Sequence, residues 1–173
     1  MGAFYKHNVN ININPPISPE SQIRISTSPS PLLFVGLNLP VVISTASLYL
    51  ENPNFNKVLT SSITVLAHLD TGASKTSIHI GLAQFLNLIP TGSLQSATAG
   101  GLITMPTFAI DLHFPNTNLA SFINLQIGSC NLNFNMNGDL NDPNNFAILL
   151  GRDILSRWNI VWNGPTSTVL IND

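Results

Sequence analysis

Short hydrophobic runs and alternating hydrophobic and polar residues recur along most of this chain, separated by turn-forming residues. Such runs are rich in β-branched residues and are bounded by Gly, Pro or Asn, which is typical of β-strands. We expect two strands between Pro31 and Leu50, and further strands at Ser61–Leu69, in a hairpin from Leu94 to Phe114, and at Leu119–Ile127, Asn131–Met136, Phe146–Leu150 and Thr168–Ile171.

Helical spacing is confined to two short segments. In Thr76–Leu88 the residues Leu82, Phe85 and Leu86 fall on one side of a helix, which Pro90 and Gly92 would end. Ile154–Trp158 fits one or two further turns, after a break at Gly151-Arg152-Asp153. Many short strands with one or two short helices predict an all-β fold closed into a barrel.

The first part of the chain has a different composition from the rest. Residues 1–31 are rich in Asn, Pro and Ser, and we expect them to form an N-terminal arm. Within it, Val9–Asn14 alternates as a strand does, so this segment either packs on the core, where it could add an edge strand, or stays part of a free extended arm. Residues 32–173 are of the length of one domain.

Charged residues make up only 8% of the sequence, and the formal net charge is −2. The six basic residues are scattered, whereas a nucleic-acid-binding protein clusters Lys and Arg to neutralise phosphates, so no nucleic-acid partner is expected. Low surface charge also leaves little to oppose self-association. The single cysteine, Cys130, favours a reducing, cytoplasmic location. The start of the chain lacks the layout of a signal peptide, and Gly36, Asn38 and Pro40 interrupt the one membrane-like run, so no membrane span is expected.

Candidate chemistry concentrates where the run from Thr64 to Leu69 delivers Asp70 into a polar turn. A carboxylate at the end of a buried strand loses hydration and needs donors, which the hydroxyl and backbone N–H groups of Thr71-Gly72-Ala73 can offer. Asp, Thr and Gly are also ordinary turn residues, so these three residues alone do not establish a site.

Two further motifs lie downstream of the turn at Asp70. Ala97–Gly101 is a small-residue hairpin tip followed by Met105-Pro106, and Ile148–Leu155 is a hydrophobic run that contains Gly151-Arg152-Asp153. Together with Leu69–Ser74, these motifs make the chain from about Pro40 to Ile171 resemble the retropepsin family, the single-domain aspartic proteases of retroviruses and their cellular and bacterial relatives. The resemblance implies a retropepsin barrel with a flap hairpin.

The resemblance also implies a role for each matched residue. Asp70, with Thr71 and Gly72, would form the catalytic loop, and Thr71 would hydrogen-bond across subunits. The residues implied in substrate binding are Ala73, Ser74, Ala99, Gly100 and Gly101, and those implied in structural support are Gly151, Arg152 and Asp153. Many retropepsins place an Asp where this chain has Ser74, which leaves open whether Asp153 or main-chain carbonyls partner Arg152.

Peptide hydrolysis by carboxylates needs two of them around one water molecule, one as general base and one as general acid. No second Asp-Ser/Thr-Gly occurs, since Asp111, Asp139 and Asp142 have other neighbours. The leading hypothesis is therefore a homodimeric aspartic endopeptidase, in which two copies of Asp70 meet at a twofold axis and cleave extended peptide or protein substrates without a cofactor. Ala73 offers no hydroxyl to the ionised Asp, which indicates a pH optimum closer to neutral than that of the two-lobed acid enzymes. The alternatives are a non-catalytic dimerisation or peptide-binding module and a structural β-domain with an accidental Asp-Thr-Gly.

The remaining chemically active side chains carry weaker signals. The spacing of His7, His68, His79 and His113 does not match a metal site, and we expect none. In a regular strand, His68 points to the same face as Asp70, so it is either a modulator of that carboxylate or a packed strand histidine. Cys130 has no nearby base and is expected to be a packed or half-exposed strand cysteine.

Overall fold

A computed structural model describes residues 23–26, 37–50, 62–98, 101–163 and 168–173. Strands dominate these residues and form two sheets. The larger sheet contains β2 (Asn38–Thr45), β3 (Ser62–Leu69), β4 (Ser77–His79), β5 (Pro90–Thr98), β6 (Gly101–His113), β7 (Phe122–Cys130) and β8 (Phe146–Leu150). The smaller one contains β1 (Ile23–Ser26), β9 (Asn159–Asn163) and β10 (Thr168–Asn172), and the helices are α2 (Ser47–Leu50), α3 (Ile80–Phe85) and α4 (Arg152–Leu155).

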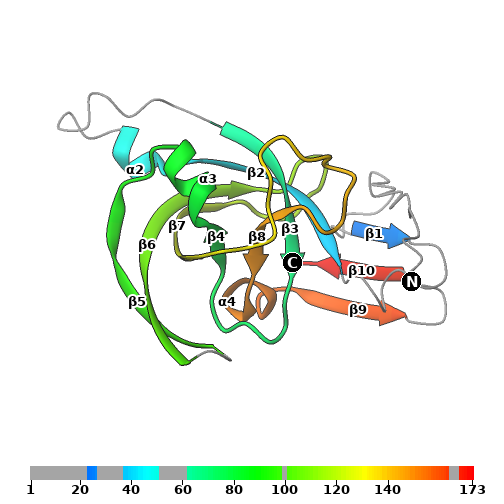
Figure 1. Ribbon diagram of the computed structural model, residues 1–173. Helices are drawn as coiled ribbons and strands as arrows, with labels where there is room; N and C mark the ends of the chain where they lie inside the picture. Colours follow the sequence, from blue (N-terminus) through cyan, green and yellow to red (C-terminus); the bar gives the residue numbers. More distant parts are fainter. Residues whose placement is uncertain (1–22, 27–36, 51–61, 99–100, 164–167) are drawn as a thin grey trace, which may run out of the picture.

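The larger sheet closes on itself. Its strands follow the order β2-β3-β8-β4-β7-β6-β5, and an additional antiparallel pairing of β2 with β6 completes a ring that leaves β5 outside (Figure 1). β5 pairs with β6 from Pro90 to Thr98, so the two strands form a long hairpin that extends beyond the barrel. This arrangement confirms the predicted all-β, barrel-like fold with short helices.

The apolar residues of the alternating pattern that predicted the strands also fill the interior of the barrel. Along β2, Leu39, Val41 and Ile43 are almost fully buried, while the residues between them are partly exposed. Successive side chains of a strand point to opposite faces, so every second residue faces the core. The same core takes in fully buried side chains from the other strands of the ring, including Ala67, Ile78, Ile110, Leu112, Ile148 and Leu150.

Two long-range pairings place the polar turn that follows β3. β3 runs parallel to β8, with His68 opposite Leu149 and Leu69 opposite Leu150. The amide of Asp70 donates to the carbonyl of Leu150 at 3.0 Å, which extends this pairing by one residue. Since α4 begins two residues after β8 ends, the turn after β3 lies against the start of α4.

Several predicted elements are confirmed where the structure describes them: the strand before Asp70, the hairpin of β5 and β6, the apolar strand β8 and the strand β10. The alternating segment Val9–Asn14 lies outside the described residues. The four described residues of the predicted arm form β1, which pairs antiparallel with β10. No helix in the described part of the chain is long and apolar enough to cross a membrane.

The prediction of two strands between Pro31 and Leu50 is wrong at its end, because residues 47–50 form α2. The amide and hydroxyl of Ser47 both donate to the Asp111 carboxylate of β6. Asp111 is buried and also accepts the amide of Asn124, which has a positive φ of 56°. A buried carboxylate from a distant strand thus ends β2 and begins the turn of helix.

The helix predicted within Thr76–Leu88 is shorter than expected. Residues 77–79 form β4, which lies between β7 and β8, and helix α3 begins at Ile80. Nδ1 of His79 accepts the amide of Gly81 at 3.1 Å and caps the helix. Leu82 and Leu86 are buried as predicted, but Phe85 is 60% exposed.

The predicted strand at residues 131–136 is absent, and β7 is displaced from 119–127 to 122–130. In the former segment, side-chain amides replace strand pairing: the amide of Asn135 donates to Oδ1 of Asn145 at 2.7 Å, and Nδ2 of Asn133 donates to the carbonyl of Asn144. The C-terminal helix also begins earlier than predicted, at Arg152, and ends at Leu155.

Candidate functional site

Asp70 lies at the end of β3 with its side chain half-buried. Its Oδ1 accepts the amide of Gly72 at 2.7 Å and the amide of Ala73 at 3.2 Å. No described residue hydrogen-bonds its Oδ2. One oxygen of the carboxyl group is therefore fixed by the backbone, and the other is available to a ligand.

Arg152 holds the same turn from its outer side. One guanidinium nitrogen, Nη1, donates to the carbonyl of Thr71 at 2.8 Å and to the carbonyl of Gly72 at 3.0 Å. The Arg152 side chain is exposed, and main-chain carbonyls partner it, which is one of the two alternatives that the sequence left open. The backbone amide of Arg152 adds a bond to the carbonyl of Ala73 at 2.9 Å.

Thr76 and Asp153 join the far end of the turn to α4. The amide and hydroxyl of Thr76 both donate to Oδ1 of Asp153, at 2.9 and 2.8 Å. The Thr76 hydroxyl oxygen also accepts the amide of Gly151 at 3.1 Å. Thr76 is fully buried, and its hydroxyl adds a second polar link between the turn and the end of β8, beside the bond from the Asp70 amide to Leu150.

Two glycines allow this close packing. A Cβ on Gly151 would lie 2.5 Å from the backbone carbon of Lys75, a separation that real Cβ atoms do not show, so only glycine fits there. A Cβ on Gly72 would lie 3.0 Å from Oδ1 of Asp70 and would press on the carboxylate. The predicted importance of both positions thus has a steric basis in this chain.

A cleft of about 420 Å³ opens beside Asp70. The turn after β3 contributes Gly72, Ala73, Ser74 and Lys75, and the barrel contributes Ser77, Cys130 and Leu149. The hairpin lines the opposite side with Leu94, Gln95, Ser96, Ala97, Ile103 and Met105. The cleft therefore lies between the carboxylate turn and the hairpin, whose curved strands extend past the barrel in Figure 1.

Four of the predicted site residues line this cleft, and the others lie beside it, behind it or outside the described residues. Asp70, Gly72, Ala73 and Ser74 line it, while the exposed Thr71 does not. Gly101 has a φ of +110°, as a hairpin tip requires, but it is not a lining residue. The predicted contacts of Ala99 and Gly100 lie outside the described residues. The turn is supported by hydrogen bonds with Gly151, Arg152 and Asp153, which do not line the cleft.

His68 lies two residues before Asp70 and is held as a packed side chain. Its Nδ1 lies 2.8 Å from Oδ1 of Asn38, whose Nδ2 donates to the carbonyl of Pro143 at 2.7 Å. The imidazole stacks on Phe146 with 4.8 Å between ring centroids. Burial lowers the pKa of His68, and the nearby charge of Asp70 opposes that shift.

Cys130 is half-buried at the end of β7, as the sequence predicted, and it also lines the cleft. Burial raises the pKa of its thiol, while a hydrogen bond with Ser77 acts in the opposite direction. A raised pKa leaves the thiol protonated at neutral pH, so it offers the cleft a small neutral surface. Among the described residues, no group of three or more His, Cys, Asp and Glu side chains is arranged to hold a metal ion.

Two residues that hold segments around the site have no signal in the sequence. Thr76 stands at the start of a helical pattern, and Asn38 interrupts a hydrophobic run. Their partners lie far away in the sequence, at Asp153 and at Pro143. A threonine or asparagine carries no local signal of such a contact.

Comparisons with known proteins add a likeness to solved structures. No protein-family model matches the sequence, and no curated protein matches it either. Among solved structures, the chain is similar to the crystal structure of a retropepsin-like aspartic protease from Rickettsia conorii, with a TM-score of 0.47 and 17% sequence identity. The alignment covers 86% of this chain and 97% of that one. At this identity, assigning chemistry to this chain depends on its own residues.

Proposed function

We propose that this protein is an aspartic endopeptidase of the retropepsin type that works as a homodimer. The observation that carries the proposal is the fixed carboxyl group of Asp70, which faces a cleft beneath a projecting hairpin. An extended peptide fits such a cleft, because its backbone can pair with the hairpin as an added strand. Closure of the hairpin over the peptide would exclude water from the reaction.

The second carboxylate would come from a second copy of the chain. Asp70 is the one acidic residue among the described residues that line the cleft. The other described acids have structural partners or lie elsewhere: Asp111 and Asp153 hold backbone amides, and Asp139 and Asp142 cap turns in the loop 138–145. Two Asp70 side chains at a twofold axis would share one proton and activate one water between them.

The exposed position of Thr71 supports this assembly. Thr71 is exposed, follows Asp70 directly in the chain and does not line the cleft. In a dimer built around the two Asp70 side chains, the Thr71 hydroxyl is free to hydrogen-bond the other copy. The same contact would bring the two turns together before any substrate binds.

Replacing Asp70 by Asn tests the proposal. The amide oxygen of Asn can still accept the amides of Gly72 and Ala73, so the turn is kept while the ionisable group is lost. We expect cleavage of an extended-peptide library to fall by at least about 1000-fold, since general acid and general base catalysis each contribute about 100-fold or more. Cleavage is read by mass spectrometry, and the assembly by sedimentation equilibrium.

Asp142→Asn is the matched control. It makes the same chemical change in an exposed loop residue that does not line the cleft, and its activity should equal that of the wild type. Activity that survives in Asp70→Asn would remove Asp70 from the mechanism, and an active strict monomer would refute the shared pair. Peptide binding without cleavage in the wild type would favour a non-catalytic peptide-binding module.

A further inference from the structure

We infer that Lys75 makes this cleft select peptides that carry an acidic side chain. The inference rests on the proposed function, because it names the class of substrate for the same cleft. Lys75 is the one basic residue among the described residues that line the cleft. Apart from Asp70, all its other lining side chains are apolar or uncharged.

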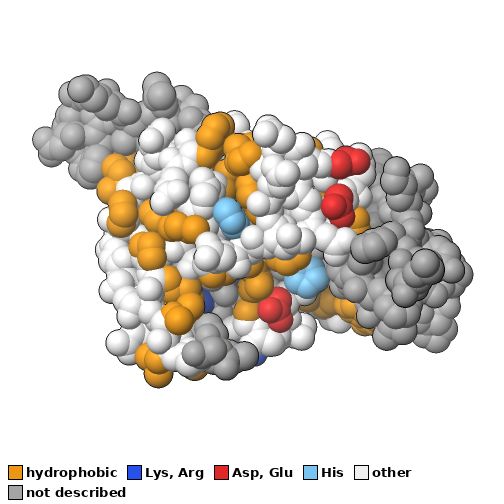
Figure 2. Space-filling view, in the orientation of Figure 1, with side chains coloured by type: hydrophobic (Ala, Val, Ile, Leu, Met, Phe, Trp, Pro, Cys, Tyr) orange, Lys and Arg blue, Asp and Glu red, His pale blue; other side chains and the backbone are white. Residues whose placement is uncertain are grey.

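The scarcity of charged residues in this chain increases the electrostatic effect of Lys75. Charged residues form 8% of the sequence, and Figure 2 shows one face of the molecule covered mainly by hydrophobic and uncharged polar groups. Few other charges are therefore present to mask the ammonium group of Lys75. Over the short distances inside a cleft, a single cation acts strongly on a side chain that binds beside it.

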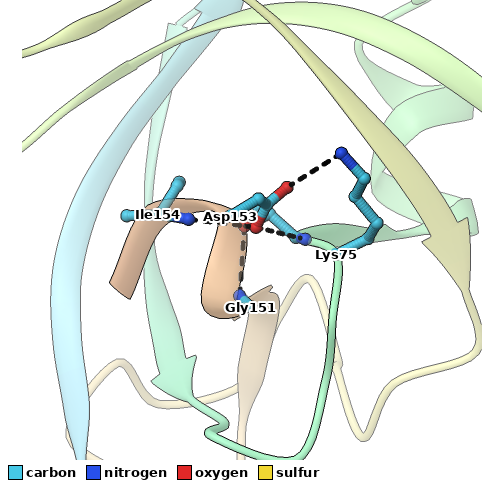
Figure 3. Close-up of polar contacts among 5 residues, drawn as sticks. Lys75, Gly151, Asp153 and Ile154 are labelled. Atoms are coloured by element: carbon cyan, nitrogen blue, oxygen red, sulfur yellow. Dashed lines mark hydrogen bonds and ion pairs between the residues drawn. The ribbon is translucent and has the colours of Figure 1, made fainter. Parts of the chain in front are cut away.

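Asp153 does not neutralise this lysine fully. Oδ2 of Asp153 lies 4.0 Å from Nζ of Lys75, at the outer limit of an ion pair, and the Lys75 side chain is 57% exposed. Figure 3 shows the lysine side chain extending away from α4, with only its end approaching the carboxylate. Oδ1 of Asp153 already accepts the amide and hydroxyl of Thr76 and the amide of Ile154. Oδ1 of Asp153 is thus occupied by Thr76 and Ile154, and Asp153 does not line the cleft.

A bound peptide would change the surroundings of the ammonium group. Under the hairpin, the peptide would displace water from Lys75, and a side-chain carboxylate would replace that hydration with a charge-assisted hydrogen bond. The neutral amide of a Gln side chain has the same shape, but its hydrogen bond would replace the lost hydration of Lys75 only partly. Because partly exposed ion pairs contribute up to about 1 kcal/mol, we expect Glu to be preferred to Gln by about fivefold at one substrate position.

The experiment compares peptides that differ by Glu, Gln or Lys at each position in turn around one cleaved bond. For the wild-type protein, kcat/KM should be about fivefold higher for Glu than for Gln at one position. Lys75→Gln should bring this ratio to about one, and Lys75→Glu should reverse it in favour of Lys. Arg157→Gln removes one positive charge from an exposed residue that does not line the cleft, and should leave the ratio unchanged.

A binding measurement separates this inference from the proposed function. The same peptides, labelled with a fluorophore, are titrated with the Asp70→Asn protein, and affinity is read by fluorescence anisotropy. A Glu preference that disappears in the double variant Asp70→Asn, Lys75→Gln supports the inference, even if the wild type cleaves nothing. Cleavage without a Glu preference at any position, or a preference that Lys75→Gln leaves intact, overturns the inference and leaves the endopeptidase in place.

Discussion

The buried hydroxyl of Thr76 provides a quantitative test of how the carboxylate turn is held. Thr76→Val keeps the shape of the side chain but removes the donor to Asp153 and the acceptor for Gly151. A hydrogen bond to a charged group contributes about 1.5–3 kcal/mol, and a buried amide left without an acceptor costs about 1–3 kcal/mol. Because Asp153 keeps the amides of Thr76 and Ile154, we expect the two effects to overlap and to total about 2–4 kcal/mol.

The measurement is the free energy of unfolding from urea denaturation, at one protein concentration because a dimer is stabilised by mass action. Thr76→Ser is the matched control, because it keeps the hydroxyl and loses only a methyl group, worth about 1 kcal/mol. Thr76→Val should also lower kcat, since the turn that carries Asp70 loses its link to α4. The reasoning is refuted if Thr76→Val is no more destabilising than Thr76→Ser.

Two further predictions concern the short helix α3. Leu82→Ala should lower the free energy of unfolding by about 2–5 kcal/mol because Leu82 is fully buried, whereas Phe85→Ala, at a residue 60% exposed, should change it by less than about 0.5 kcal/mol. Equal effects in urea denaturation would contradict this assignment of faces. Burial lowers the pKa of His79, so the unfolded chain binds more protons than the folded protein as the pH drops below about 6.5. The free energy of unfolding should therefore fall with the pH in this range. Once Nδ1 of His79 is protonated, it can no longer accept the amide of Gly81. His79→Asn keeps a capping acceptor without titrating, and its melting temperature between pH 5 and 7 should depend less on pH than that of the wild type; an unchanged dependence would exclude His79 as the source.

The elements that the sequence predicted correctly are those whose signal is local. The run before Asp70 and the run Phe146–Leu150 are continuous or alternating apolar segments, and burial in the barrel is enough to make them strands. Two glycines between two strand-like stretches predict the hairpin of β5 and β6. Each of these signals is complete within about ten residues of the chain.

The errors arise where a distant side chain decides the backbone. Residues 131–136 alternate as a half-buried strand would, yet Asn145 takes the amide of Asn135 and no strand partner is present among the described residues. Ser47 leaves the strand because Asp111, 64 residues away, accepts its amide. Such contacts replace the pairing that propensity alone would favour. For the same reason, the sequence does not predict that Thr76 supports the site, although it does predict the motif around Asp70.

The arrangement around Arg152 links the support of the turn to the chemistry proposed for it. In a trans peptide unit the carbonyl and the N–H point in opposite directions. The carbonyl of Thr71 and the amide of Gly72 belong to one such unit, and the carbonyl of Gly72 and the amide of Ala73 belong to the next. Arg152 binds both carbonyls, and Asp70 Oδ1 accepts both amides. A guanidinium on the outer surface therefore fixes the two peptide planes whose opposite edges hold the carboxylate. A turn fixed on both edges stays in place while a proton moves on or off Asp70, which is the property that a carboxylate alternating between acid and base requires.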